Sequence, residues 1–374
     1  MSPGGGIIDI QTDMRNKAVF ALLLFLFLGS AALPVEGRKK DHVIGFYNLE
    51  NLFDTVHDEG KNDYDFTPEG RNAWTEERYN KKLSNMATVL RDMKIRNNAW
   101  HTVLGVAEVE NGRVLADLVA RPEIAEAGFS FMHYESPDRR GIDVGLLYRP
   151  SEFKVLESVA IPYDFNSDIS FEYNEEERNA FRTRDILMVR GTIEGEMFCF
   201  YVTHTPSRVG NKGGDLRGRS CEIIRQDALR RMIEYPGLKV IVMGDMNDNP
   251  ADPSQVEYLH ARETMEEVGE GDFFSPFISM HKAGYGTEEY RGEWNIFDII
   301  VVSKSLCEAP RGSFTVKPVE KGIYYGGVFV EPYMVQQEGP YAGTPKRTFS
   351  GGQFNDGYSD HYPTYIVISR KKGK

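Results

Sequence analysis

The sequence predicts an α/β protein in which two layers of β-sheet are covered by helices. Short apolar runs rich in β-branched residues recur along the chain with turn residues between them, as buried strands do. Between several of these runs, apolar residues recur at helical spacing. No stretch rich in Pro, Ser or charge interrupts this alternation, so residues 38–374 are expected to form a single domain.

Strands are expected where a short apolar run is bounded by turn residues. These runs cover residues 43–48, 102–107, 144–148, 186–189, 198–203, 240–243, 299–302 and 364–368.

Helices are expected at residues 76–94, 218–233 and 257–267, each of which carries apolar residues on one helical face. The loops at 163–182 and 310–358 are long and rich in Gly, Tyr and Phe. Long loops of this kind often shape binding sites, so we expect them to form the rim of one.

The N-terminal residues 1–37 are predicted to be an extension followed by a secretory signal peptide. Met14 begins a short basic stretch, residues 18–28 are apolar, and small residues follow at 29–32. This pattern predicts a secreted or periplasmic protein whose mature form has no stable membrane span. The same residues would also suit an uncleaved N-terminal anchor.

Charge and cysteine content narrow the function. The formal net charge is −12, which disfavours the long-range attraction that basic proteins have for nucleic acid, although a bound metal ion can reverse the sign inside a cleft. Three cysteines are too few for a disulfide framework or a thiolate metal site. The protein is expected to be a monomer, although no sequence motif indicates its oligomeric state.

Polar residues with metal-binding or acid–base chemistry recur near the ends of the apolar runs. One such residue would usually be a helix cap or turn residue, but the recurrence suggests a shared site. The set comprises Asn48 in NLEN, Glu108 in AEVEN, Asp245 and Asn247 in GDMND, Asp298 in DIIVV, and Asp360 and His361 in SDHYP.

These motifs, in this order over about residues 41–370, resemble the endonuclease/exonuclease/phosphatase superfamily, which includes pancreatic-type deoxyribonuclease and related secreted bacterial members. The resemblance implies a four-layer α/β sandwich, in which two packed mixed or antiparallel sheets are flanked by helices. It also implies a metal-dependent hydrolase of phosphoesters.

The resemblance further implies a metal site. Glu108 would be the metal carboxylate, with Asn48 beside it and Asp360 orienting the ion or binding it through water. Oxygen donors of this kind suit Mg²⁺, with Mn²⁺ or Ca²⁺ as alternatives.

Acid–base residues are implied in the same way. Asp298 would orient His361, while Asp245 and Asn247 would place the attacking water, and either Asp245 or His361 would take its proton. His204, which follows the run 198–203, resembles the second histidine of the deoxyribonuclease branch. It would protonate the leaving oxygen, unless it merely packs at a strand end.

Substrate contacts are less clearly marked. Arg140 and Arg184 are candidates for phosphate binding or are solvated surface arginines. The basic loop 207–219 would either clamp a phosphate or be an exposed loop with arginines for solubility. Trp294 would line the leaving-group pocket or, with slight preference, lie in the core.

Hydrolysis of a phosphodiester by water attack, as in an endonuclease, is the leading functional hypothesis, which makes nucleic acid a candidate partner. The alternative is a phospholipid or phosphoinositide phosphoesterase of the sphingomyelinase type, in which the aromatic residues Tyr324, Tyr325 and Phe329 insert at a membrane. A non-catalytic binding protein on the same fold ranks last, because the motif positions are chemically intact.

Overall fold

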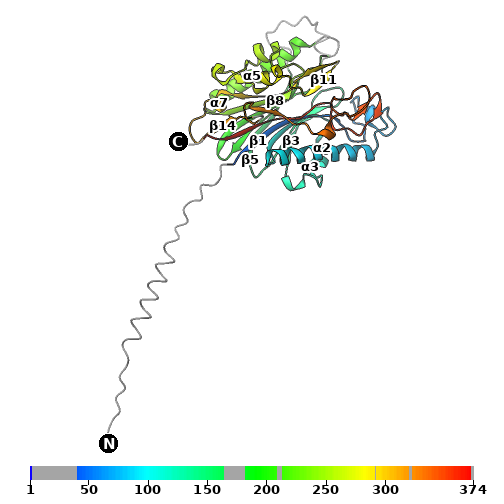
Figure 1. The fold of residues 1–374 in the computed structure, drawn as a ribbon, viewed down its shortest axis with the longest axis horizontal. Helices are drawn as coiled ribbons and strands as arrows, with labels where there is room; N and C mark the ends of the chain where they lie inside the picture. Colours follow the sequence, from blue (N-terminus) through cyan, green and yellow to red (C-terminus); the bar gives the residue numbers. More distant parts are fainter. Residues whose placement is uncertain (2–39, 164–181, 209–212, 291, 320–321, 372–374) are drawn as a thin grey trace. The chain divides into compact units, whose positions relative to one another are not determined.

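The computed structural model describes residues 1, 40–163, 182–208, 213–290, 292–319 and 322–371 (Figure 1). The chain divides into two compact units, Met1–Lys40 and Asp41–Lys374, and every element below belongs to the second. Apart from Met1, the predicted extension and signal peptide at 1–37 lie outside the described residues, as does most of the predicted loop 163–182. None of the helices in the described ranges is long and apolar enough to cross a membrane.

One seven-stranded sheet holds the first and last strands of the domain. Its central strand β1 (His42–Leu52) runs parallel to β2 (His101–Val109) and antiparallel to β18 (Thr364–Arg370). The sheet is completed by β4 (Asp143–Tyr148), β3 (Ser130–His133), β14 (Phe314–Lys317) and β15 (Gly326–Val328).

A second seven-stranded sheet is built from the middle of the chain. Here β7 (Glu196–His204) runs parallel to β8 (Lys239–Asp245), which is antiparallel to β13 (Asp298–Ser303). The remaining strands are β5 (Phe153–Ile161), β6 (Ile186–Ile193), β9 (Ala261–Arg262) and β10 (Phe273–Phe274).

Helices cover the outer faces of both sheets. Figure 1 shows α2 (Glu76–Asn97) and α3 (Gly112–Val119) on one side and α5 (Gly214–Glu234) on the other. The predicted four-layer sandwich is therefore confirmed. Short elements complete the domain: α6 (Pro276–Lys282), α7 (Lys304–Cys307), the hairpin β11 (Glu288–Tyr290) and β12 (Glu293–Asn295), and the hairpin β16 (Phe349–Ser350) and β17 (Gln353–Phe354).

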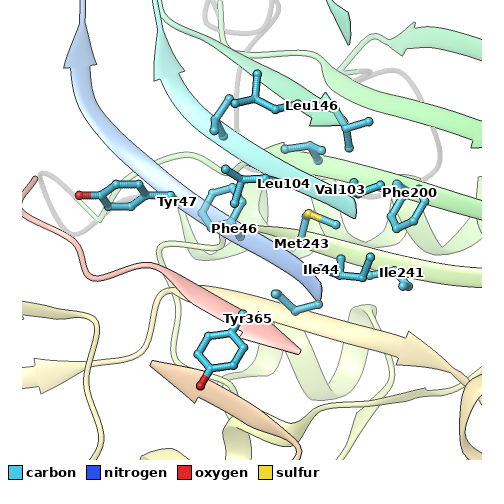
Figure 2. Packing of buried hydrophobic residues seen from close by; sticks show 14 of the residues in the cluster. Ile44, Phe46, Tyr47, Val103, Leu104, Leu146, Phe200, Ile241, Met243 and Tyr365 are labelled. Atoms are coloured by element: carbon cyan, nitrogen blue, oxygen red, sulfur yellow. The ribbon is translucent and has the colours of Figure 1, made fainter. Parts of the chain in front are cut away.

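The core lies between the two sheets. Figure 2 shows side chains of β1 and β2, such as Phe46 and Val103, facing Phe200 and Met243 from the second sheet. The sheets approach closely at Gly105, where an added Cβ would lie 2.6 Å from the sulfur of Met243. Side chains alternate along a strand, so the polar residues that continue the core-facing side of a strand point toward the end of the space between the sheets.

All eight predicted strands are confirmed, as are the helices predicted at 76–94 and 218–233. The helix predicted at 257–267 is wrong. The chain there makes one π-helical turn (Ser254–Tyr258), the strand β9 and a 3₁₀ turn (Met265–Glu267). His260, with φ of +61°, breaks the helical path, and Thr264 begins the new turn with a capping box.

Candidate active site

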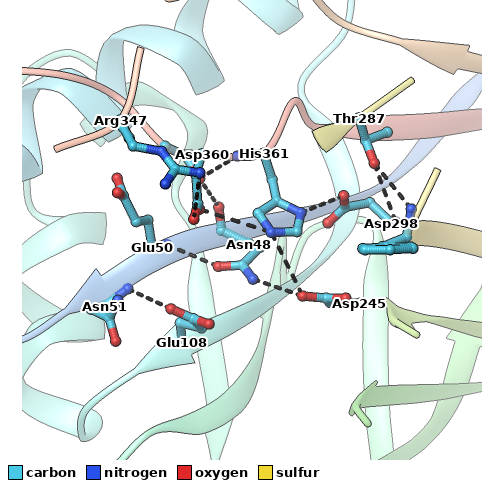
Figure 3. Close-up of polar contacts among 12 residues, drawn as sticks. Asn48, Glu50, Asn51, Glu108, Asp245, Thr287, Asp298, Arg347, Asp360 and His361 are labelled. Atoms are coloured by element: carbon cyan, nitrogen blue, oxygen red, sulfur yellow. Dashed lines mark hydrogen bonds and ion pairs between the residues drawn. The ribbon is translucent and has the colours of Figure 1, made fainter. Parts of the chain in front are cut away.

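Predicted site residues from both sheets lie together at one end of the sheets. Figure 3 shows Asn48, Glu108, Asp245, Asp298, Asp360 and His361 there. Strands β1 and β2 are parallel, and so are β7 and β8, so each pair presents its C-terminal ends at the same edge. Strands β13 and β18 are antiparallel to their neighbours and begin at these edges. Asp298 is therefore the first residue of β13, and Asp360 and His361 lie just before β18. These residues lie at the same edge as the strand ends that carry Asn48, Glu108, His204 and Asp245.

Asn48 connects the two sheets. It follows Ile44 and Phe46 on the core-facing side of β1, as strand alternation requires. Its Nδ2 donates to Oδ2 of Asp245 on β8 at 3.0 Å, and both residues are buried. The backbone N–H of Glu50 donates to Asn48 Oδ1 at 2.9 Å, which fixes the orientation of the amide.

Glu108 is turned toward the site by an irregularity in β2. Gly105 faces the core, so regular alternation would direct Glu108 toward the helices instead. The register with β4 shifts between Ala107 and Val109, and Glu108 has a φ of +59°. Its Oε2 accepts from the Asn51 N–H at 2.9 Å. Bulges and left-handed backbone of this kind are costly and are concentrated at functional sites.

Asp245 lies at the centre of the group. Its Oδ1 accepts from the backbone N–H of Asn247 at 2.9 Å, and Oδ2 accepts from Asn48. Burial raises the pKa of Asp245 to about 6; the positive charge of His361 opposes this rise, while the charges of Asp298 and Glu108 add to it. Asn247 takes a left-handed φ of +47° and donates from Nδ2 to the Thr205 carbonyl at 3.1 Å.

His361 and Asp298 form a buried pair. Nδ1 of His361 donates to Asp298 Oδ2 at 2.7 Å, and Nε2 lies 3.8 Å from Oδ2 of Asp245. Burial lowers the pKa of His361, but the carboxylates of Asp298, Asp360 and Asp245 outweigh it and hold that pKa well above its ordinary value.

His204 faces the same group from the end of β7. Its Nε2 lies 3.4 Å from Asp245 Oδ2 and 3.9 Å from Glu108 Oε1. Nδ1 has no hydrogen-bond partner among the described residues. Burial, assisted by the positive charges of Arg184 and Arg140, holds the pKa of His204 well below its ordinary value, so the ring is neutral.

The two candidate arginines differ in their surroundings. Arg184 is buried, and its guanidinium donates to the carbonyls of His204 at 3.1 Å and Thr205 at 2.9 Å and to Asp138 at 3.2 Å. It therefore supports the end of β7 from inside the protein. Arg140 is exposed, and its charge acts on His204.

The basic loop predicted at 207–219 is only partly described, because 209–212 lie outside the described residues. Helix α5 begins at Gly214, earlier than predicted. Arg217 and Arg219 are buried, and Nε of Arg217 lies 2.8 Å from Asp248 Oδ2. These two arginines are therefore not solvated surface groups.

Asp360 and Trp294 complete the predicted set. Asp360 is partly exposed, with Oδ2 3.6 Å from Arg347 and Oδ1 3.8 Å from Nε2 of His361. The slight preference for a core position of Trp294 is wrong. The indole is 39% exposed and stacks on Tyr362, with ring centroids 6.0 Å apart.

Sequence reasoning missed three residues near this site. Glu50 and Lys82 form an ion pair beside Asn48, and Glu288 of β11 adds another carboxylate. Burial raises the pKa of Glu288 to about 7; the positive charge of His361 opposes the rise, and the carboxylate of Asp360 adds to it. Glu50 lies inside the NLEN motif, so its position could have marked it, whereas Lys82 and Glu288 carry no sequence signal.

The donor set fits a hard divalent cation. Glu108, Asp360 and the amide of Asn48 offer oxygen atoms at one edge of the sheets, and oxygen is the ligand atom that Mg²⁺ prefers.

Several solved structures have a similar fold. A crystal structure of an endonuclease/exonuclease/phosphatase family protein from Bacteroides thetaiotaomicron shares 16% identity, with a TM-score of 0.54, over 89% of this chain and 99% of that one. A mannosyl-6-phosphatase from the same organism shares 17% identity, with a TM-score of 0.52, over 87% and 99%. The catalytic domain of human Nocturnin shares 14%, with a TM-score of 0.50, over 88% and 95%.

These likenesses establish the fold alone. No curated protein matches the sequence. The model of the endonuclease/exonuclease/phosphatase family matches residues 43–370, which is most of the chain and contains all the motifs described above. The protein therefore belongs to the endonuclease/exonuclease/phosphatase family.

Proposed function

We propose that the protein is a divalent-metal-dependent phosphodiesterase of the endonuclease type, which hydrolyses its substrate by attack of water on phosphorus. The observation that carries this proposal is the convergence of the His361–Asp298 pair, Asp245 and Glu108 at one end of the sheets. Family membership supports phosphoester hydrolysis in general.

In this proposal each ionisable group has a different task. Asp245, with a pKa of about 6, is ionised at neutral pH and is the proton acceptor for the attacking water. His361 remains an imidazolium and donates from Nε2 to the phosphoryl oxygens, where negative charge grows in the transition state. This division favours Asp245 over His361 as the general base.

His204 and Asn247 act on the same phosphate without carrying charge. The neutral ring of His204 donates a hydrogen bond from its N–H to the leaving oxygen, which takes its proton from solvent, and the Asn247 amide holds the water beside Asp245.

Glu108, Asn48 and Asp360 would hold the divalent ion, with Mg²⁺ as the proposed species. When bound, such an ion supplies charge neutralisation for the phosphate.

A nucleic-acid substrate is supported by the exposed ring of Trp294. The indole is 39% exposed and stacks on the ring of Tyr362, the residue that follows His361, so its exposed part is available for contact with a base.

The insertion of aromatic rings that the phospholipid alternative invokes is not favoured. Phe329 is fully buried, and Tyr324 and Tyr325 pack edge-to-face against Tyr285 and Phe274, with centroids 5.5 Å and 5.6 Å apart.

Export through residues 1–37 is part of the same proposal. It predicts that the chain appears outside the cytoplasm in shortened form, and that a chain starting near residue 38 stays inside. Fractionation followed by N-terminal sequencing decides this.

Nicking of supercoiled plasmid by the protein from about residue 38 onward tests the activity, with Mg²⁺ or Mn²⁺ and with EDTA. His361→Ala is the inactive variant, and His281→Ala on α6 is the matched control, because it removes a histidine that is not among the predicted site residues. Nicking that needs metal and is lost only in His361→Ala supports the proposal.

Hydrolysis of a small chromogenic phosphodiester without nicking would retain the phosphoesterase and reject the nucleic-acid substrate. No hydrolysis of either by the folded protein would reject both.

A further inference from the structure

Thr287 places a buried hydroxyl beside the His361–Asp298 pair (Figure 3). It directly precedes β11 and is 0% exposed. Its Oγ1 accepts from the backbone N–H of Phe297 at 3.2 Å and, more weakly, from that of Asp298 at 3.5 Å. Buried backbone N–H groups need an acceptor, so this hydroxyl holds the start of β13 in place.

The main chain of Thr287 holds the segment that carries the other member of the pair. Its carbonyl accepts from the N–H of Tyr362 at 2.8 Å, and Tyr362 directly follows His361. Its own N–H donates to the Asn295 carbonyl at 2.7 Å. One residue is therefore hydrogen-bonded to the chain next to Asp298 and to the chain next to His361.

The carboxylate of Asp298 depends on this backbone support. Its Oδ2 accepts from His361 Nδ1 at 2.7 Å, whereas its Oδ1 is buried and has no hydrogen-bond partner among the described residues. No second bond at Oδ1 therefore fixes the direction of the carboxylate. The position of the Asp298 backbone decides where this group meets the imidazole.

We propose that Thr287 is a positioning residue of the reaction. Its hydroxyl fixes the start of β13, and through it the carboxylate of Asp298, so that His361 is held in its working orientation. Thr287 acts through this pair and does not touch the substrate. The inference rests on the proposed function, in which His361 faces the phosphate.

A hydroxyl that only stabilises the fold is the competing explanation, and the same strand offers a matched control for it. Ser303, the last residue of β13, is 1% exposed, and its Oγ accepts from the Val240 N–H at 2.9 Å. Both hydroxyls accept from a buried backbone N–H, at opposite ends of β13. Loss of either should destabilise the fold, but only Thr287 contacts the backbone of Asp298.

Steady-state hydrolysis of a small chromogenic phosphodiester by the full-length protein with Mg²⁺ tests the proposal, alongside thermal melting. Thr287→Val is expected to lower kcat by about 10- to 100-fold, because small displacements of catalytic groups are costly. KM should change by less than about twofold, since Thr287 does not bind the substrate. Thr287→Ser keeps the hydroxyl and should restore kcat. Ser303→Ala should lower the melting temperature but keep the wild-type kcat.

Proton NMR supplies a second readout that needs no substrate. The proton between His361 Nδ1 and Asp298 should give a downfield signal in the wild type, identified by its loss in Asp298→Asn. In Thr287→Val this signal should move upfield and exchange faster with water, and in Ser303→Ala it should be unchanged. Thr287→Ala, which places no methyl group against the Phe297 N–H, carries the same expectations if Thr287→Val does not fold.

A folded Thr287→Val with the wild-type kcat or an unchanged NMR signal would overturn the inference. So would an equal loss of kcat in Ser303→Ala, or no recovery in Thr287→Ser. A wild type that hydrolyses no phosphodiester would reject the proposed function, and the NMR signal of the Thr287 variants would still decide whether Thr287 positions the pair.

Discussion

Asp245 on β8 and Asp298 on β13 are directly opposite partners across neighbouring antiparallel strands, and the imidazole of His361 contacts both carboxylates. This register explains why two distant sequence motifs act on one ring. Two buried acids beside one histidine favour its charged form, so the ring of His361 is held as a positive charge at the site.

Replacing Asp298 by Asn should lower turnover by about 10² to 10⁴-fold, because His361 loses the carboxylate that orients and charges it. The substitution is nearly isosteric, so the protein should stay folded. Single-turnover hydrolysis and thermal melting measure the two effects. Turnover within a factor of a few of the wild type would remove Asp298 from the mechanism.

Activity should fall at acidic pH as Asp245 takes up a proton. Its pKa is raised to about 6, so the ionised base is present above that pH and is lost below it. A log plot of kcat/KM against pH should therefore bend near pH 6 and fall about tenfold per unit below it. Glu288, with a pKa of about 7, is the other candidate for this limb. The bend should persist in Glu288→Gln; its disappearance there would assign the limb to Glu288.

Arg184 and Arg140 should differ in what their loss does. Arg184→Met removes a buried guanidinium that holds two backbone carbonyls at the end of β7, and should lower the melting temperature as well as the activity. Arg140→Ala should raise KM with an unchanged melting temperature if Arg140 binds the phosphate. An unchanged KM would show that Arg140 is a solvated surface residue without a role in binding the phosphate.

His101 should make the fold sensitive to acid. Burial lowers its pKa to about 4, and neither ring nitrogen has a hydrogen-bond partner within the described ranges. Below pH 6.5 the unfolded chain binds a proton that the folded chain does not, so stability falls from pH 6.5 down to about pH 4. The full loss is about 3 kcal/mol.

Urea unfolding at pH 7 and pH 5 measures this effect, with His101→Leu as the comparison. The variant should lose less stability on acidification than the wild type. An equal loss in both proteins would assign the acid sensitivity to other groups.

Much of the fold could be predicted from the sequence because the strands are strongly apolar and well separated. The failure at 257–267 has a local cause. Apolar spacing there is helical, but His260 adopts a left-handed conformation and the segment joins the second sheet through β9. The pattern of apolar residues does not show which strands pair with one another.

The candidate site could be predicted only where short motifs marked it. Asn48, Asp245, Asp298 and His361 meet as expected because their strands share one edge. The reorientation of Glu108 depends on a register shift, which no residue type signals. Lys82 was equally hidden, since a lysine on an amphipathic helix is usually solvated, and only packing shows that this one points inward.

The close approach at Gly105 and Met243 affects more than stability. Asn48 and Glu108 belong to one sheet, whereas His204, Asp245 and Asp298 belong to the other, so inter-sheet spacing sets the distances on which the chemistry depends. A larger residue between the two sheets could separate Asn48 from Asp245 while leaving the hydrogen bonds within each sheet intact. Substitutions in the core are therefore expected to change the geometry of the candidate site as well as the stability of the fold.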